Sequence, residues 1–274
     1  MSRILTSLHG RRLGLNDASP PQLIVPGGIV SGDHGSQFFE PSPTTYVQFD
    51  DFMGDTLNTF LWHNPTKGSD AGTADFAILQ GVSGVIRGTT GAGAGATMAV
   101  NGILIDGGLD WKANSGGLYF QTRLKMSSLA TIALFAGFTD QVSTLEMPIN
   151  MNAGVAITTT ATDAVGFVFD TNATTATWKL LGVANDVDAT LQEAVQSTTV
   201  LTSAPTAAVY DTLRIEVSTA GVASFFLNGK QVGTKMTGAV TATVALTPCI
   251  ATFVRAAIST TVDVDYIAVG SLRV

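Results

Sequence analysis

Apolar and polar residues alternate along several segments of this chain, and this period of two restricts the fold more than any other feature. In residues 118–126 the apolar side chains fall on one face and the polar ones on the other. The apolar face holds Leu118, Phe120, Leu124 and Met126, and the polar face holds Gln121, Arg123 and Lys125. Residues 212–218 repeat the pattern. This spacing predicts half-buried β-strands rather than helices.

Turn signals separate these segments and support an all-β reading. Asn228-Gly229 lies between two apolar runs, and this dipeptide favours a type I′ turn, so residues 223–233 are predicted to form a hairpin. A last strand is predicted over 262–269. Helical signals are scarce, and only residues 188–195 could form two turns of helix. The chain also contains 29 glycines. Together these features predict a two-sheet antiparallel sandwich.

Residues 1–48 differ from the rest of the chain. They hold five of the nine prolines, a Gly27-Gly28 pair and several apolar residues that need burial. Because proline removes backbone donors, we expect no regular element longer than a turn or a short strand there. An extended irregular arm that packs onto a neighbouring molecule fits both facts, and an arm lying on its own body is the alternative. The predicted organisation is therefore an arm at 1–48 and a body at 49–274.

Charge restricts the partners of the chain. The net charge is −7, with 14 basic and 21 acidic residues, so the protein should not bind nucleic acid. Residues 1–12 carry Arg3, Arg11 and Arg12 and no acidic residue. This charge suggests docking to an acidic protein surface, and a solvated tail is the alternative. The chain contains no unbroken run of 18 apolar residues, so a membrane-spanning helix is not predicted.

Cysteine usage and the first residues bear on where the protein is made. Cys249 is the only cysteine, so no intrachain disulfide can form, and its apolar surroundings predict a small buried residue. No secretory signal peptide is visible after Met1, because Ser7, His9 and Arg11 interrupt the apolar stretch. We therefore expect synthesis in a cytosol.

Three segments of the body resemble the concanavalin A-like lectin/glucanase family, also called laminin-G-like. Phe49-Asp50-Asp51-Phe52 followed by Trp62 is similar to the first strand and turn of such domains. Residues 210–233 are similar to their late hairpin, and residues 264–269 to their terminal strand. The resemblance implies a jelly roll, that is, a two-sheet antiparallel sandwich, over about four fifths of the chain.

The leader at residues 5–15 resembles that of tailed-phage virion proteins that attach to a capsid. An irregular arm followed by a weakly charged jelly roll is also similar to phage head decoration proteins and head fibres. The resemblance implies a capsid decoration or cement protein on the virion surface, made in the host cytoplasm, that binds the major capsid protein and itself as a homo-oligomer, with a trimer as first choice. The attachment residues it indicates are Arg3, Leu8, Arg11, Arg12, Leu13 and Leu15.

Catalytic and metal-binding patterns are weak in this sequence. Glycoside hydrolases of the family place glutamates around an aspartate in Glu-x-Asp-x-x-Glu or a shorter form, and no two of the four glutamates here are within 20 residues of each other. His9, His34 and His63 are far apart, so neither a zinc site nor a triad is indicated. We therefore expect no enzyme, cofactor or metal site. Asp186 and Asp188 allow two interpretations. They could belong to a solvated turn, or they could bind calcium at that turn.

The aromatic residues suggest glycan binding as a second possible function. Sugar rings stack on flat aromatic faces, so an exposed tryptophan or tyrosine could let the body bind host surface glycans as a head- or tail-fibre adhesin. Trp111 in the loop-like segment 107–112 and Tyr119 on the polar face of its strand are the candidates. For Trp111 a core or interface role is the favoured reading, and a ligand platform is the alternative.

Overall fold

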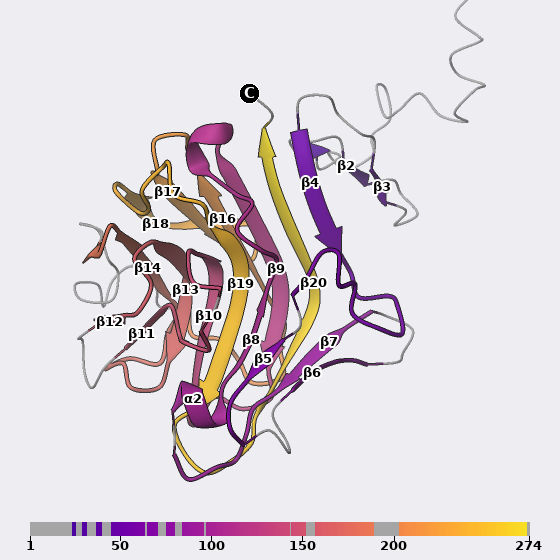
Figure 1. The fold of residues 1–274 in the computed structure, drawn as a ribbon, viewed down its shortest axis with the longest axis vertical. Coiled ribbons are helices and arrows are strands. Elements are labelled where there is room, and N and C mark those ends of the chain that lie inside the picture. The colour runs from indigo at the N-terminus through magenta and orange to yellow at the C-terminus, as the bar shows by residue number, and fades with distance from the viewer. Residues whose placement is uncertain are drawn as a thin grey trace, which may run out of the picture. The chain divides into compact units, whose positions relative to one another are not determined.

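The structure is a computed structural model, and Figure 1 shows its ribbon. The residues it describes are 24–25, 29–31, 37–39, 45–63, 65–70, 75–79, 84–95, 97–142, 144–151, 157–188 and 203–272. The chain divides into two compact units, Met1–Tyr46 with Arg273 and Val47–Leu272 with Val274.

The first unit contains a small antiparallel sheet of three short strands. These are β1 (Ile24–Val25), β2 (Ile29–Ser31) and β3 (Gln37–Phe39), in the order β1-β2-β3. Strands of two or three residues are what a segment rich in proline and glycine allows. The predicted attachment residues Arg3, Leu8, Arg11, Arg12, Leu13 and Leu15 lie outside the described residues.

The second unit, which we call the body, contains an antiparallel sheet of eight strands. Its order is β18-β17-β16-β9-β20-β7-β6, and β4 also pairs with β20. The strands are β4 (Thr45–Asp50), β6 (Asp75–Ile78), β7 (Ile86–Thr89), β9 (Leu118–Met126), β16 (Asp211–Val217), β17 (Ala223–Leu227), β18 (Lys230–Met236) and β20 (Thr261–Leu272). The predicted strand at 118–126 and the predicted hairpin are confirmed, with positive φ at Asn228 and Gly229.

A second antiparallel sheet of seven strands completes the sandwich. Its order is β15-β14-β13-β10-β19-β8-β5. The strands are β5 (Thr66–Lys67), β8 (Ile103–Asp106), β10 (Ile132–Thr139), β13 (Ala164–Asp170), β14 (Lys179–Ala184), β15 (Val187–Asp188) and β19 (Thr247–Val254). Helix is confined in the described residues to α2 (Met98–Asn101) and one 3-10 turn at Ala113–Ser115. The predicted all-β two-sheet sandwich is confirmed.

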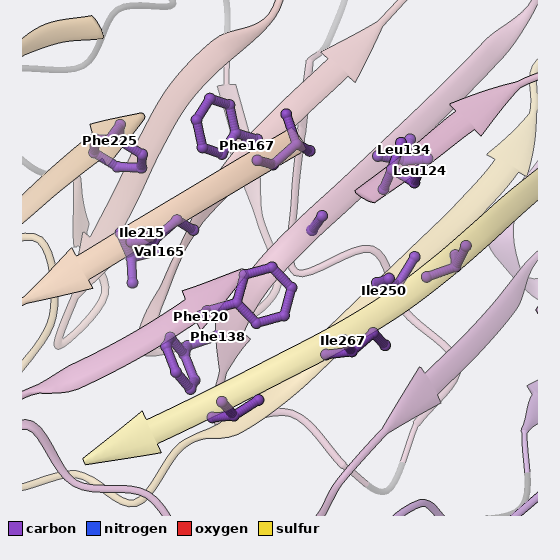
Figure 2. Packing of buried hydrophobic residues seen from close by; sticks show 14 of the residues in the cluster. Phe120, Leu124, Leu134, Phe138, Val165, Phe167, Ile215, Phe225, Ile250 and Ile267 are labelled. Atoms are coloured by element: carbon purple, nitrogen blue, oxygen red, sulfur yellow. The ribbon is translucent and has the colours of Figure 1, made fainter. Parts of the chain in front are cut away.

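The main core lies between the two sheets and consists of the inward-facing apolar side chains (Figure 2). Aromatic rings from opposite sheets meet edge to face. The centroids of Phe120 and Phe138 are 5.8 Å apart, and those of Phe167 and Phe225 are 5.5 Å apart. Edge-to-face pairs of this kind add roughly 1 kcal/mol to the gain from burial alone. The alternation of apolar and polar residues in the sequence therefore places the apolar side chains between the two sheets.

A second apolar core covers the outer face of the seven-stranded sheet. Strands β10, β13 and β19 are buried at every position, so they bury side chains on both faces. The hairpin of β11 (Ile149–Met151) and β12 (Ile157–Thr159) supplies apolar side chains to this core, which includes Phe135, Val168 and Phe253. Cys249 belongs to it and is buried as predicted.

A buried ion pair fixes the hairpin to the sheet. The guanidinium of Arg255 donates to both carboxylate oxygens of Asp170, at 2.7 and 2.5 Å, and to the carbonyl oxygen of Met151 at 2.9 Å. The backbone N–H of Met151 donates back to Asp170 at 2.9 Å. Along the central strands of the eight-stranded sheet, fully buried and less buried side chains alternate, so the outer face of this sheet carries the polar side chains.

Candidate functional site

The polar face of the eight-stranded sheet carries a row of paired charges. Arg87 on β7 donates to Asp263 on β20 through Nε and Nη2, at 2.6 and 2.8 Å, and the Nζ of Lys125 lies 3.4 Å from the same carboxylate. Burial alone would raise the pKa of Asp263, but the hydrogen bonds and charges of Arg87 and Lys125 lower that pKa below its ordinary value. Arg123 pairs with Asp265 at 2.6 Å. Both carboxylates are thus bound to cations from neighbouring strands.

Tyr119 lies on this face, as its place in the alternation predicts, and belongs to a hydrogen-bond chain. Its hydroxyl donates to Oε1 of Gln121 at 2.6 Å, and Nε2 of Gln121 donates to the hydroxyl of Tyr266 at 2.6 Å. Burial raises the pKa of Tyr119 well above its ordinary value, so the phenol stays neutral. The ring is half-buried. Its role as a glycan platform stays a prediction.

Cationic side chains cover aromatic rings on the same sheet as these hydrogen bonds. The guanidinium of Arg214 lies 3.8 Å from the ring centroid of Phe226, and that of Arg123 lies 4.1 Å from the ring of Tyr210. Cation–π contacts of this kind contribute roughly 0.5–1 kcal/mol at exposed sites. The aromatic faces of this sheet are therefore used within the protein itself.

Trp111 lies in the core, in agreement with the favoured of its two readings and not with a platform. Its main chain forms an isolated β-bridge with Leu246, donating to the Leu246 oxygen at 3.1 Å and accepting from the Leu246 nitrogen at 2.7 Å. The side chain is 3% exposed and belongs to the main core. A glycine-rich context indicated a surface loop, but the bridge turns the ring inward, so Trp111 cannot stack on a ligand in this structure.

A polar pair at the end of β8 was not singled out in the sequence. The Nδ1 of His63 lies 2.7 Å from Oδ1 of the buried Asp106, while the imidazole is 58% exposed. Burial raises the pKa of Asp106, and the backbone N–H of Gly108 together with His63 partly offsets that rise. A carboxylate on Nδ1 fixes the ring orientation of a histidine and leaves Nε2 for another partner.

Next to this pair, a turn displays Phe60 with 98% of its surface exposed. The carbonyl oxygen of Asn58 accepts the N–H of Leu61 at 3.1 Å and of Trp62 at 3.0 Å, and the side chain of Asn58 accepts the N–H of Phe60 at 3.0 Å. Trp62 is buried and donates through Nε1 to Asp50 at 2.8 Å. Hydrogen bonds thus hold the backbone of the turn, and the side chain of Phe60 lies in solvent.

Gly108 separates two polar groups beside this turn. A Cβ at Gly108 would lie 3.4 Å from Nε2 of His63 and 3.8 Å from Oδ2 of Asp110, so the two atoms flank the space above the glycine. Gly108 has φ +85, a conformation that favours glycine. His63, Asp106 and Asp110, which lie around Gly108, form what we call the rim site. No sequence motif marks it, because its three members depend on a turn and a positive φ.

Acidic residues elsewhere in the described parts form no metal cluster. Across these parts no group of three or more histidines, cysteines, aspartates or glutamates is placed to hold a metal ion. Asp186 occupies a turn with φ +61, and the side chain of Asp188 lies outside the described residues. Among the described helices, none is long and apolar enough to cross a membrane.

Comparison with known proteins places the fold. No family model and no curated protein sequence matches the chain. A Bacillus licheniformis β-glucanase structure has a TM-score of 0.52 and 12% identity, covering 83% of this chain and 98% of its own. The carbohydrate recognition domain of Emp47p has a TM-score of 0.54 and 8% identity, covering 86% and 100%.

A κ-carrageenase from Pseudoalteromonas carrageenovora, solved with an oligosaccharide, has a TM-score of 0.51 and 11% identity, covering 85% of this chain and 97% of its own. At these identities the likeness defines the fold, which is the concanavalin A-like jelly roll of lectin-type and glycanase domains. The resemblance seen in the sequence is confirmed in that respect.

The expectation that the chain is not an enzyme is wrong on this comparison. Several structures with its fold are glycoside hydrolases, among them the β-glucanase and the κ-carrageenase. The expectation depended on a missing linear glutamate motif, and a motif is a narrower criterion than a fold.

Proposed function

We propose that this protein is a structural component of a phage virion, attached to the capsid shell through its N-terminal segment. The observation that carries the proposal is the division of the chain. The body, Val47–Leu272, has its own complete core, while the residues before it form a separate unit. In this proposal the sandwich folds around its own core, and the basic and apolar residues of the N-terminal segment bind another molecule.

The mechanism of attachment is burial and repetition. Apolar side chains such as Leu8, Leu13 and Leu15 contribute about 25 cal/mol for each Å² removed from water. Arg3, Arg11 and Arg12 supply charge for an acidic partner surface. Many copies bound to one shell multiply a modest affinity through avidity. The partners in this proposal are the major capsid protein and sister copies, at the virion surface, after synthesis in the host cytoplasm.

A charge-reversal experiment tests attachment with the full chain. Arg3→Glu, Arg11→Glu and Arg12→Glu combined should abolish co-sedimentation with capsid particles, because the surface they face is acidic. The matched control combines Lys112→Glu, Lys230→Glu and Lys235→Glu, which reverses three exposed charges on the body. Equal loss in both variants, or binding retained by the first, would refute the proposal.

Glycan binding by the body is the second candidate function. It is favoured by the exposed aromatic side chain of Phe60, three residues before His63, and by the carbohydrate recognition domain among the structures of the same fold. A glycan array probed with the full chain tests it. Following each bound oligosaccharide for new reducing ends tells binding from cleavage, since the same fold also occurs in glycoside hydrolases.

A further inference from the structure

We infer that Asp70, Asn101 and the glycine-rich loop at 91–95 form a binding site for a calcium ion. Three segments meet there: residues 68–70, which follow β5, the loop, which follows β7, and Asn101, the last residue of α2. These residues take no part in the capsid-attachment or glycan-binding proposals, and the inference goes beyond both.

Asn101 provides the observation that points to a ligand. Its side chain is fully buried, and its Nδ2 donates to the carbonyl oxygen of Gly93 at 2.8 Å, which determines the end of the amide that is oxygen. That oxygen, Oδ1, is also buried and accepts no hydrogen bond from the described residues. A buried acceptor without a partner is costly, so Oδ1 requires a hydrogen-bond donor or a cation.

Asp70 supplies a negative charge beside this oxygen. Oδ2 of Asp70 accepts the backbone N–H of Ala92 at 2.6 Å, while its Oδ1 has neither a hydrogen-bond partner nor a cationic partner among the described residues. The Cβ of Asp70 and Oδ1 of Asn101 lie 3.3 and 3.0 Å from the position that a Cβ on Gly93 would take. Both side chains therefore lie against the same part of the loop, and a carboxylate beside an amide oxygen favours a cation over a neutral donor.

Backbone hydrogen bonds hold the three segments together without an ion. The N–H of Asp70 donates to the carbonyl oxygen of Val100 at 3.0 Å. The N–H of Gly91 donates to the carbonyl oxygen of Asn101, also at 3.0 Å. Asp70 is half-buried and so remains within reach of solvent. A site that is already assembled needs little ordering when its ligand arrives.

The chemistry of the site favours calcium. Its side-chain ligands are oxygens, which hard cations prefer, and Ca²⁺ takes about six to eight of them in a flexible geometry that includes carbonyl oxygens and water. Mg²⁺ requires a near-ideal octahedron and loses its waters reluctantly. With one carboxylate the affinity should be weak, with a Kd of about 1 mM, and loop carbonyl groups and water would supply the remaining ligands. A bound ion would join the loop after β7 of the eight-stranded sheet to the segment before β8 of the seven-stranded sheet.

The test uses the full chain, freed of metal with a chelator, in calorimetric titration with CaCl₂ and in chemical denaturation with and without calcium. Calcium at about ten times the Kd should raise the folding equilibrium constant about tenfold. Asp70→Asn keeps an acceptor for the Ala92 N–H but removes the charge, and it should weaken calcium binding about tenfold or more. The matched control is Asp75→Asn, which removes an exposed carboxylate nearby in the sequence and should bind calcium as the wild type does.

NMR of the wild type follows the site directly, because the side-chain amide signals of Asn101 should shift with the same midpoint as the titration. This measurement decides the matter if circular dichroism shows that Asp70→Asn does not fold. Equal calcium binding by Asp70→Asn and its control, or Asn101 signals that do not move, would overturn the site. Equal stabilisation by NaCl or KCl at matched ionic strength would overturn the choice of calcium. No effect of any cation would leave a buried water as the partner of Asn101 and refute the inference.

Discussion

At the scale of single residues, two ion pairs of the body differ in how far their charges are removed from water. Asp170 is fully buried and accepts from Arg255, Met151 and Asn172. Asp265 accepts from Arg123 at a more exposed position on the opposite sheet. The two aspartates form similar ion pairs under different solvation, so they make a matched comparison.

Asp170→Asn should lower the free energy of unfolding by roughly 3 kcal/mol, because it leaves the Arg255 charge largely buried without its partner. Asp265→Asn should cost less than about 1 kcal/mol, as for exposed ion pairs. Urea denaturation of both variants measures the difference. Similar losses of stability at the two positions would contradict the argument that Asp170 is buried and Asp265 is more exposed.

Asp263 links stability to pH. Its pKa is lowered in the folded protein from an ordinary value of 3.8, despite burial, by Arg87 and Lys125. A lowered carboxyl pKa contributes stability that is present above pH 3.8 and is lost as the pH falls through the folded-state pKa. Asp263→Asn should therefore flatten the stability profile below pH 4. Thermal unfolding between pH 2.5 and 6 checks this, and a profile parallel to that of the wild type would refute it.

At the scale of elements, alternation and turn chemistry were sufficient to predict some strands and could not predict others. The strand at Leu118–Met126 and the Asn228-Gly229 hairpin depend on contacts close in sequence and on backbone preference. The hairpin β11–β12 has no such signal. Its position depends on Arg255 reaching Asp170, 85 residues away, and apolar runs show that β10 and β13 are buried without showing what covers them.

The same distinction applies to the rim site. His63 and Asp106 are brought together by folding, and neither lies in a sequence motif that relates them. Trp111 is held in the core by a bridge to Leu246, more than 100 residues later, which its glycine-rich segment alone could not indicate. Local patterns predict elements well, whereas sites built from several loops require the tertiary structure.

Gly229 allows a clean test of the predicted turn. It has φ +79, and a Cβ there would meet nothing within 4 Å. Gly229→Ala should therefore destabilise the body by about 1 kcal/mol through backbone strain alone. Gly229→Asn should cost less, because asparagine tolerates this conformation. Chemical denaturation compares them, and an alanine variant as stable as the wild type would contradict the strain argument.

At the scale of the whole molecule, the two units predict separable folding and attachment. A truncated chain that starts at Thr45 keeps β4 and the complete core of the body. It should remain soluble and rich in β-structure, with cooperative unfolding, yet fail to co-sediment with capsid particles. Circular dichroism and the particle-binding assay measure the two properties. Normal attachment by the truncated chain would show that the body, not the N-terminal segment, contacts the shell.

Self-association is the last prediction at this scale. Only 13% of the residues are charged, and residues 1–48 contain apolar side chains such as Ile24, Val25, Phe38 and Phe39 that need burial. Closed symmetry is the common way to bury such surface between identical chains, so the free protein should be a homo-oligomer, with a trimer as the expected size. Analytical ultracentrifugation across micromolar concentrations measures the mass, and the chain starting at Thr45 is the control. A monomeric full chain would contradict the prediction, and an oligomeric truncated chain would place the interface on the body.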